Sequence, residues 1–315
     1  MPSYAPGITA IVPTYKRVTD LDRCLAALEK QTLPATALLL CYREEDTETV
    51  AYLARKDRHG LGAQLILCDQ PGQVYALSKA IDAVETEYLA ITDDDSIPQP
   101  DWLERMVAHF ESDPRVAGVG GRDHVFEHGH WLEGAEPVVG LVRWYGITVG
   151  NHHIGVGTAR PVHMLKGVNM GYRRSALGNL RPDARLRGKG AQVGNDMKLS
   201  LELVARGYTL IYDPAVLVEH FPGVRPKEEN RAYFNPGSHF DEYFNRTLIL
   251  LEFLETQPWG WLRQCAMMMY LGLRGTRKGP GLGMLAVDLA TGYPNALARF
   301  RTTFAAYRAA IAAAR

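Results

Sequence analysis

The stretch YLAITDDDSIPQPDWLERM, residues 88–106, decides the predicted fold. Residues 88–92 are an apolar run of the kind that forms a buried parallel strand, and DWLERM is typical of a helix start. Asp93, Asp94 and Asp95 come directly after the strand. Because ligands bind beyond the carboxyl ends of the strands in open α/β sheets, we expect these carboxylates to lie at a binding edge.

Strand-like and helix-like segments alternate before this stretch, and one further strand follows it. The apolar runs predicted as strands are 8–12, 37–42, 64–68 and 115–121. The segments predicted as helices are 20–30, 47–58 and 74–84. This alternation predicts βαβ units, and therefore an α/β fold with a mostly parallel, Rossmann-like sheet flanked by helices.

The next part of the chain is less regular. Residues 122–166 are rich in Gly, His and Trp and show no clear period, so we expect a long, partly irregular insertion that lines an acceptor site. The elements predicted after it are a strand at 167–172, a helix at 195–206 and short strands at 208–212 and 216–220. Asp213 and Pro214 divide the last two strands. We expect them to end a catalytic unit that covers residues 1–225.

Residues 226–315 are expected to form a helical appendage. Amphipathic helices are predicted at 241–255 and 258–274, and a Gly-rich turn and further helices follow. The apolar faces include Trp259 and Trp261, with the basic residues Arg263, Arg274, Arg277 and Lys278 nearby. We expect these faces to dock on the catalytic unit, and contact with a membrane surface is the alternative.

Composition limits the function and the location. The 35 basic and 35 acidic residues balance, so no overall field favours nucleic acid as a partner. The four cysteines are far apart and form no CxxC pair, which argues against a zinc knuckle and a disulfide framework. We find no secretory signal and no apolar run of about 18 residues. A cytoplasmic protein is expected, with peripheral contact at the inner face of the membrane as an option.

Three adjacent carboxylates repel one another unless a cation or several hydrogen bonds compensate their charge. Mg²⁺ and Mn²⁺ prefer oxygen ligands and are commonly held by one or two carboxylates together with diphosphate oxygens. Asp93, Asp94 and Asp95 are therefore predicted to hold a metal-bound nucleotide diphosphate. The alternative is an acidic loop that only caps the following helix.

Several motifs, in order along the chain, strengthen this hypothesis. They are ITAIVPTYKR (8–17), LDRCLAALEKQTLP (21–34), ITDDDSIPQPDWLERM (91–106), KGVNMGYRRSAL (166–177) and GNDMKLSLELVARGYTLIYDPAVLVEH (194–220). Together they resemble family 2 glycosyltransferases of the GT-A fold over residues 8–222. The sequence departs from the family at Ala76-Leu77-Ser78, where an Ala-Arg-Asn triplet is common, and at Asn195, where Glu is common.

The resemblance implies an inverting, metal-dependent transfer of a sugar from a nucleotide-diphosphate sugar, with a UDP-sugar favoured, to an acceptor hydroxyl. It implies Asp196 as the general base and Asp93, Asp95 and His220 as ligands of Mn²⁺ or Mg²⁺. A bacterial role in making a surface polysaccharide, a glycolipid or a glycoside follows by analogy. The alternatives are an inactive carbohydrate-binding or scaffolding homologue and a nucleotidyltransferase.

The resemblance also implies the remaining contacts. On the nucleotide-sugar side they are Pro13, Tyr15, Arg17, Asp46, Lys79, Asp93 and Asp94. On the side of the acceptor and donor sugar they are Trp102, Gly167, Asn169 and Asn195. Four of these assignments have ordinary alternatives. Asp46 could be a solvated charge, Lys79 a surface lysine, Trp102 a core side chain, and Asn195 with Asp196 a helix cap.

Overall fold

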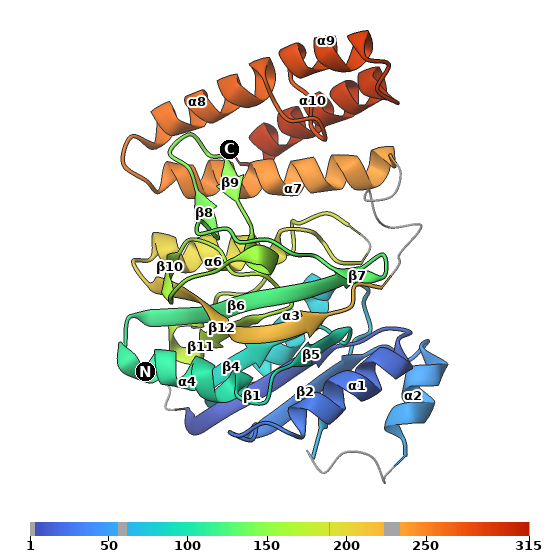
Figure 1. Cartoon of the computed structure of the whole chain (residues 1–315), viewed down its shortest axis with the longest axis vertical. Helices are drawn as coiled ribbons and strands as arrows, with labels where there is room; N and C mark the ends of the chain where they lie inside the picture. The colour runs from blue at the N-terminus through green and yellow to red at the C-terminus, as the bar shows by residue number, and fades with distance from the viewer. Residues whose placement is uncertain (1–3, 56–61, 189, 224–233, 315) are drawn as a thin grey trace.

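The structure is a computed structural model that describes residues 4–55, 62–188, 190–223 and 234–314 (Figure 1). Its central element is a ten-stranded sheet with the strand order β10-β12-β6-β11-β4-β1-β2-β3, to which β5 and β7 pair at the side. Strands β1, β2, β3 and β4 are mutually parallel, as are β6 and β12, whereas β11 lies antiparallel between β4 and β6. The expected α/β fold with a mostly parallel sheet is confirmed.

The strands and helices of this unit have the following bounds. The strands are β1 (Ala5–Pro13), β2 (Ala37–Tyr42), β3 (Gln64–Leu67), β4 (Thr86–Ile91), β5 (Ser96–Pro98), β6 (Val116–Glu127), β10 (Arg160–Val162), β11 (Met170–Arg173) and β12 (Thr209–His220). The helices are α1 (Val18–Leu28), α2 (Thr47–Leu53), α3 (Gln73–Asp82), α4 (Trp102–Ser112), α5 (Arg174–Leu177) and α6 (Asn195–Ala205). The helix expected at 47–58 ends at Leu53, and its last three positions lie outside the described residues.

Helices cover both faces of the sheet because its central strands are apolar on both sides. In β1, Ile8 and Val12 belong to one core cluster with residues of α1 and α4, whereas Ile11 belongs to a second cluster with residues of α3 and α6. This alternation follows from the two-residue period of a strand. The sheet is therefore a rigid platform, and its loops carry the polar residues.

Strand β12 differs from the prediction of two short strands. It runs continuously from Thr209 to His220 beside β6, and the pairing register shifts between Asp213 and Val218. Pro214 lies in this irregular part, where a missing N–H is tolerated. Because the strand continues, it also pairs antiparallel with β5 and places His220 opposite Ser96.

The insertion at 122–166 is more ordered than expected. Strand β6 continues into it and pairs with β7 (His130–Trp131). The hairpin of β8 (Leu141–Val142) and β9 (Thr148–Val149) follows, and then the short 3₁₀ helix η1 (His152–Ile154) and β10. The irregular stretch is therefore a series of short elements built around the end of the sheet.

The C-terminal helices are α7 (Pro236–Glu255), α8 (Gly260–Leu273), α9 (Leu282–Ala290) and α10 (Ala296–Ala313). Helix α7 packs through Ile249 and Leu250 against Leu201 of α6, and Glu252 pairs with Lys198 at 2.6 Å. Docking on the catalytic unit is thus observed for α7. The expectation is wrong for Trp259 and Trp261, whose side chains are exposed. The expected boundary between residues 225 and 226 lies outside the described residues. Among the described helices, none has the length and apolar character needed to cross a bilayer.

Candidate active site

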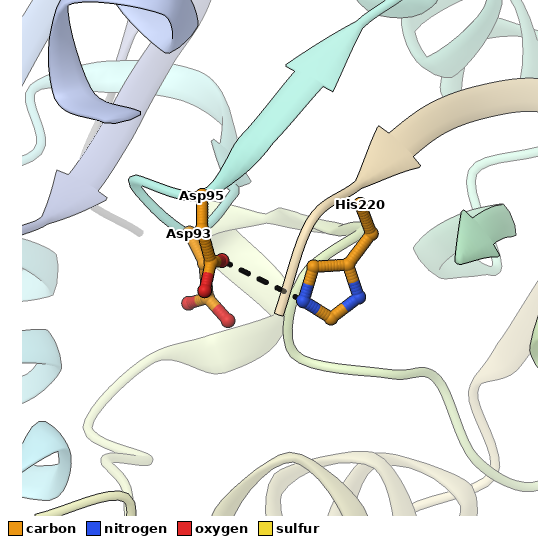
Figure 2. Close-up of side chains that lie close together, drawn as sticks. All are labelled: Asp93, Asp95 and His220. Atoms are coloured by element: carbon orange, nitrogen blue, oxygen red, sulfur yellow. Dashed lines mark ion pairs between the residues drawn. The ribbon is translucent and has the colours of Figure 1, made fainter. Parts of the chain in front are cut away.

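Asp93, Asp95 and His220 form a cluster at the carboxyl end of β4. The two aspartates come from the β4–β5 connection and the histidine from the end of β12. One ligand atom from each of the three lies within 4.8 Å of the others, and Asp95 and His220 are buried. Figure 2 shows the Asp95 carboxylate directed at the imidazole ring, with Oδ1 3.5 Å from Nε2. The three predicted metal ligands are therefore brought together.

The chemistry of this cluster suits a divalent cation. Within the described part of the chain, Oδ1 of Asp95 is buried and has no hydrogen-bond donor. Two carboxylates and one imidazole nitrogen make a donor set that Mn²⁺ and Mg²⁺ accept, with further oxygens supplied by water or phosphate. The residues present thus fit such an ion.

A second carboxylate, Asp123 on β6, lies on the other side of the histidine. Its Oδ2 is 3.6 Å from Nδ1 of His220, and it also pairs with Nζ of Lys166. Asp123 is fully buried, and burial raises its pKa, but the charge of Lys166 and the nearby imidazole of His220 outweigh burial and lower the pKa to about 2. Burial lowers the pKa of His220, but Asp123 and Asp95 outweigh it and raise the pKa.

Arg17, in the loop after β1, supplies a positive charge to the aspartate cluster. Its guanidinium pairs with Asp95 and lies 3.3 Å from Asp94. The two carboxylates respond differently. Burial raises the pKa of Asp94 to about 7 despite the charge of Arg17. Burial also acts to raise the pKa of Asp95, but His220 and Arg17 outweigh it, so this pKa lies below its ordinary value.

The other residues of the first loop are tied to the same aspartates. The backbone N–H of Tyr15 donates to Oδ2 of Asp94 at 3.4 Å, and the ring of Tyr15 is exposed. Pro13 ends β1 and forms the base of the loop. Asp46 is buried and is the N-cap of α2, where its carboxylate accepts from the backbone N–H of Thr49. The same carboxylate also accepts from the backbone N–H of Lys16 in the first loop. The alternative of a solvated Asp46 is therefore wrong, because this carboxylate holds the loop in place.

Gln73, at the start of α3, connects the two sides of the site and was not foreseen. Its Nε2 donates to Oδ1 of Asp93 at 3.2 Å, and its Oε1 accepts from Asn195 at 3.3 Å. Lys79, two turns further along α3, donates to the carbonyl of Leu67 and pairs with Asp69 on the surface. The structure thus favours the surface-lysine alternative for Lys79.

Asp196 lies in the first turn of α6 and faces the loop before β11. Its Oδ2 accepts from the backbone N–H of Gly167 at 3.0 Å, and its Oδ1 accepts from Met197 at 2.8 Å. The predicted base and the predicted glycine are therefore neighbours. Asn195 is buried, and its side-chain amide donates to Oε1 of Gln73 and to the carbonyl of Ala191.

Two residues predicted on the acceptor side lie in the core instead. Trp102 has no exposed surface, so its ring does not offer a platform to a sugar. Its Nε1 donates to Oδ1 of Asn169 at 2.8 Å. Asn169 is equally buried, and its amide donates to the carbonyls of Arg122 and Val216. This pair joins α4 to the loop before β11, which corrects the prediction for both residues.

The sheet topology is that of the GT-A-like fold. Residues 6–238 match the model described as glycosyltransferase like family 2. The chain belongs to this family and is a glycosyltransferase. No curated protein sequence matches it.

Two solved structures resemble the fold. The mannosyltransferase PcManGT from Pyrobaculum calidifontis, in complex with GDP-Man and Mn²⁺, matches with a TM-score of 0.52 and 19% identity. That match covers 99% of this chain and 88% of the other. GalNAc-T7, with UDP, GalNAc and Mn²⁺, matches with a TM-score of 0.58 and 13% identity over 91% of this chain, which spans 58% of GalNAc-T7.

Proposed function

We propose that the chain moves a sugar from a nucleotide-diphosphate sugar to an acceptor hydroxyl with inversion at the anomeric carbon. The observation that carries this proposal is the bridge made by Gln73, which bonds both Asp93 and Asn195. The bridge supports the proposal because it links Asp93, one of the predicted metal ligands, to the N-terminus of α6, which carries Asp196. A metal group for the leaving diphosphate and a base for the acceptor are the two parts that such a transfer needs.

The donor side would use charge and backbone donors. Asp93, Asp95 and His220 would hold a Mn²⁺ or Mg²⁺ ion, which neutralises the diphosphate and stabilises the charge that develops on the leaving group. Arg17 and Tyr15 lie beside the same carboxylates. We propose that they contact the nucleotide diphosphate, with Pro13 and Asp46 fixing the loop. Asp94 would stay within this network and not bind the ion directly.

The acceptor side would use Asp196 as general base. The acceptor oxygen forms a bond to the anomeric carbon while the bond from that carbon to the diphosphate oxygen breaks, and the hydroxyl proton passes to Asp196. Gly167 orients the carboxylate through its N–H. The N-terminus of α6 favours the charged form of Asp196 before the reaction.

The finer points of the proposal rest on family analogy. PcManGT is described with GDP-Man and Mn²⁺, and GalNAc-T7 with UDP and Mn²⁺. The shared Mn²⁺ supports a metal ion, whereas the nucleotides differ between the two proteins. We propose a UDP-sugar as donor, and a surface polysaccharide, glycolipid or glycoside of a bacterium as product. The catalytic unit would cover residues 1–225 and act in the cytoplasm, at or near the inner face of the membrane.

Calorimetric titration with UDP, GDP and dTDP, in Mn²⁺ and in EDTA, tests the proposal. Wild type should bind one nucleotide only with metal, and Asp95→Ala should abolish that binding. Asp101→Ala is the control, because Asp101 lies between β5 and α4 and pairs with Arg105 at the surface. Failure of wild type to bind any nucleotide would support the inactive-homologue alternative. Incorporation of a nucleoside monophosphate into product would support a nucleotidyltransferase.

A further inference from the structure

Exposed apolar side chains gather on the outermost helices. Among the described residues, fifteen large hydrophobic side chains are exposed, and nine of them lie between Trp259 and Leu297. The nine are Trp259, Trp261, Leu262, Met269, Leu273, Leu282, Val287, Leu289 and Leu297. The two tryptophans are the most exposed of these side chains, at 71% and 68%. A monomeric soluble protein rarely leaves so many on one part of its surface.

The exposed residues of α8 form one stripe. Trp261, Cys265, Met269 and Leu273 recur every four residues, and all four are exposed. On α9 the neighbours Val287 and Leu289 are exposed, whereas Asp288 between them is fully buried. A surface helix normally turns its polar side outward. Here the polarity is reversed, and we call the exposed residues of α8 and α9 the outer apolar face.

The outer apolar face is not used in packing the rest of the chain. Figure 1 shows α8 and α9 as the layer farthest from the sheet, with α7 and α10 between them and the catalytic unit. Helix α8 still contributes inward, because Met267 packs into the cluster of Leu254 and Ile249. Helix α8 therefore packs inward through Met267 and presents apolar residues on its outer side.

Charge distinguishes this part of the chain from the remainder. Residues 259–314 contain seven basic residues and a single acidic one, although the whole chain is balanced. The acidic residue is Asp288, which is buried near Arg277. Arg274, Arg277 and Lys278 are exposed in the turn between α8 and α9. The outer apolar face is thus bordered by positive charge.

We infer that the outer apolar face docks on an anionic phospholipid bilayer. Helices that lie in the plane of a membrane interface combine an apolar side, basic residues and tryptophan, because apolar groups enter the acyl boundary while the cations meet lipid phosphates. Trp259 and Trp261 stand where aromatic anchors are found. A second copy of the chain suits this surface less well, because a symmetric pair would bring the same basic turns together.

Vesicle sedimentation of the full chain tests this inference. The protein should bind vesicles of phosphatidylcholine with phosphatidylglycerol, should bind phosphatidylcholine alone weakly, and should be released as salt rises. The combined variant Met269→Gln, Leu273→Gln should lose binding. The control is Leu65→Gln with Leu67→Gln, which changes two exposed side chains of similar size on β3.

The charged border is tested separately. Replacing Arg274 and Lys278 by Gln should weaken binding about thirtyfold, because each basic residue close to an anionic bilayer contributes about fivefold. Lys30→Gln with Arg206→Gln is the control for loss of two exposed charges elsewhere. Emission from tryptophan should shift to the blue on anionic vesicles in wild type, and Trp261→Ser should reduce the shift.

Two outcomes would overturn the inference. One is equal binding of the wild type and of the Met269→Gln, Leu273→Gln variant to anionic vesicles. The other is a wild type that does not bind vesicles but is dimeric by light scattering, while the Met269→Gln, Leu273→Gln variant is monomeric. That result would assign the outer apolar face to contact with a second copy of the chain. Nucleotide titration of each variant without vesicles shows that the fold is intact. It also separates failure of this inference from failure of the proposed sugar transfer.

Discussion

The carboxylate of Asp123 lies 3.6 Å from Nδ1 of His220, and the carboxylate of Asp95 lies 3.5 Å from Nε2 of the same ring. The two aspartates therefore approach the imidazole from opposite sides. If Asp123 accepts the proton on Nδ1, the lone pair of Nε2 is directed at the aspartate cluster. A carboxylate behind a histidine in this way fixes the tautomer and the ring orientation of a metal ligand.

Asp123→Asn should weaken Mn²⁺ binding about tenfold or more, because the amide no longer favours the proton on Nδ1. Electron paramagnetic resonance of free Mn²⁺ measures this directly and needs no turnover. Asp213→Asn is the control, since Asp213 of β12 also faces a histidine, His109 of α4, at 2.8 Å, and neither residue is a proposed metal ligand. Unchanged Mn²⁺ affinity in Asp123→Asn would show that His220 does not depend on this carboxylate.

Arg17→Gln should destabilise the protein by roughly 3 kcal/mol in EDTA, because it leaves the buried carboxylates of Asp94 and Asp95 without their cation. Mn²⁺ should restore more stability to this variant than to wild type, since the ion can then neutralise the same carboxylates. Urea unfolding with and without Mn²⁺ measures both effects. Arg105→Gln, which breaks an exposed pair, should change little. Equal responses to Mn²⁺ would argue against a shared role.

Asp196→Asn should lower kcat about a hundredfold or more while the nucleotide Kd stays the same, because general-base catalysis is lost but the amide oxygen can still accept from Gly167. Steady-state kinetics and calorimetry together separate the two quantities. Glu202→Gln, on the same helix, should keep most of the activity. A variant that binds nucleotide and turns over normally would remove Asp196 from the proposed mechanism.

Trp102→Phe should destabilise the fold by about 2 kcal/mol, because it leaves Oδ1 of the buried Asn169 without its donor. The KM for acceptor should not change, since the ring is in the core. Trp144→Phe, at an exposed position, should have little effect on stability. A change in acceptor KM without loss of stability would favour the original assignment of Trp102 to the acceptor site.

His239 should make the C-terminal helices sensitive to acid. It is fully buried, its imidazole lies 2.8 Å from Thr303 of α10, and burial with the nearby Arg299 lowers its pKa to about 4. The folded protein therefore binds fewer protons here than the unfolded chain does. The contribution of His239 is fully present above about pH 6.5 and is lost as pH falls toward 4, by up to about 3 kcal/mol.

Urea unfolding at several pH values checks this expectation. His239→Gln should reduce the loss of stability between pH 6.5 and 4, because the group that resists protonation is gone. His130→Gln, at an exposed position of β7, is the control and should leave the slope unchanged. Parallel curves for wild type and His239→Gln would contradict the prediction.

Local patterns were enough to predict much of the fold. The strand at 37–42 has the bounds of β2, because a short apolar run between polar breaks leaves few alternatives. The prediction of a break at Asp213 and Pro214 was wrong, because pairing with β6 carries β12 through an irregular register. No local pattern reveals that pairing, which depends on residues about 90 positions earlier in the chain.

Some residues of the candidate site could likewise be predicted from the sequence, and others could not. Asp93, Asp95 and His220 follow strands in recognisable motifs, so the sequence could predict them. Asp123 and Gln73 stand in no motif, and only the positions of β6 and α3 beside the site give them a role. Trp102 could have been placed correctly, since it shares a helical face with Met106 and Phe110, and such a face normally enters the core.

The pairing of Lys198 with Glu252 has a consequence for how the chain can be divided. Helix α6 carries Asp196 in its first turn, and α7 packs against the outer side of this helix. Deleting the C-terminal helices would expose Leu201 and leave the start of α6 without support. A shortened chain that ends at residue 225 should therefore fold less stably and hold Asp196 less accurately. The C-terminal helices thus support α6 from its outer side.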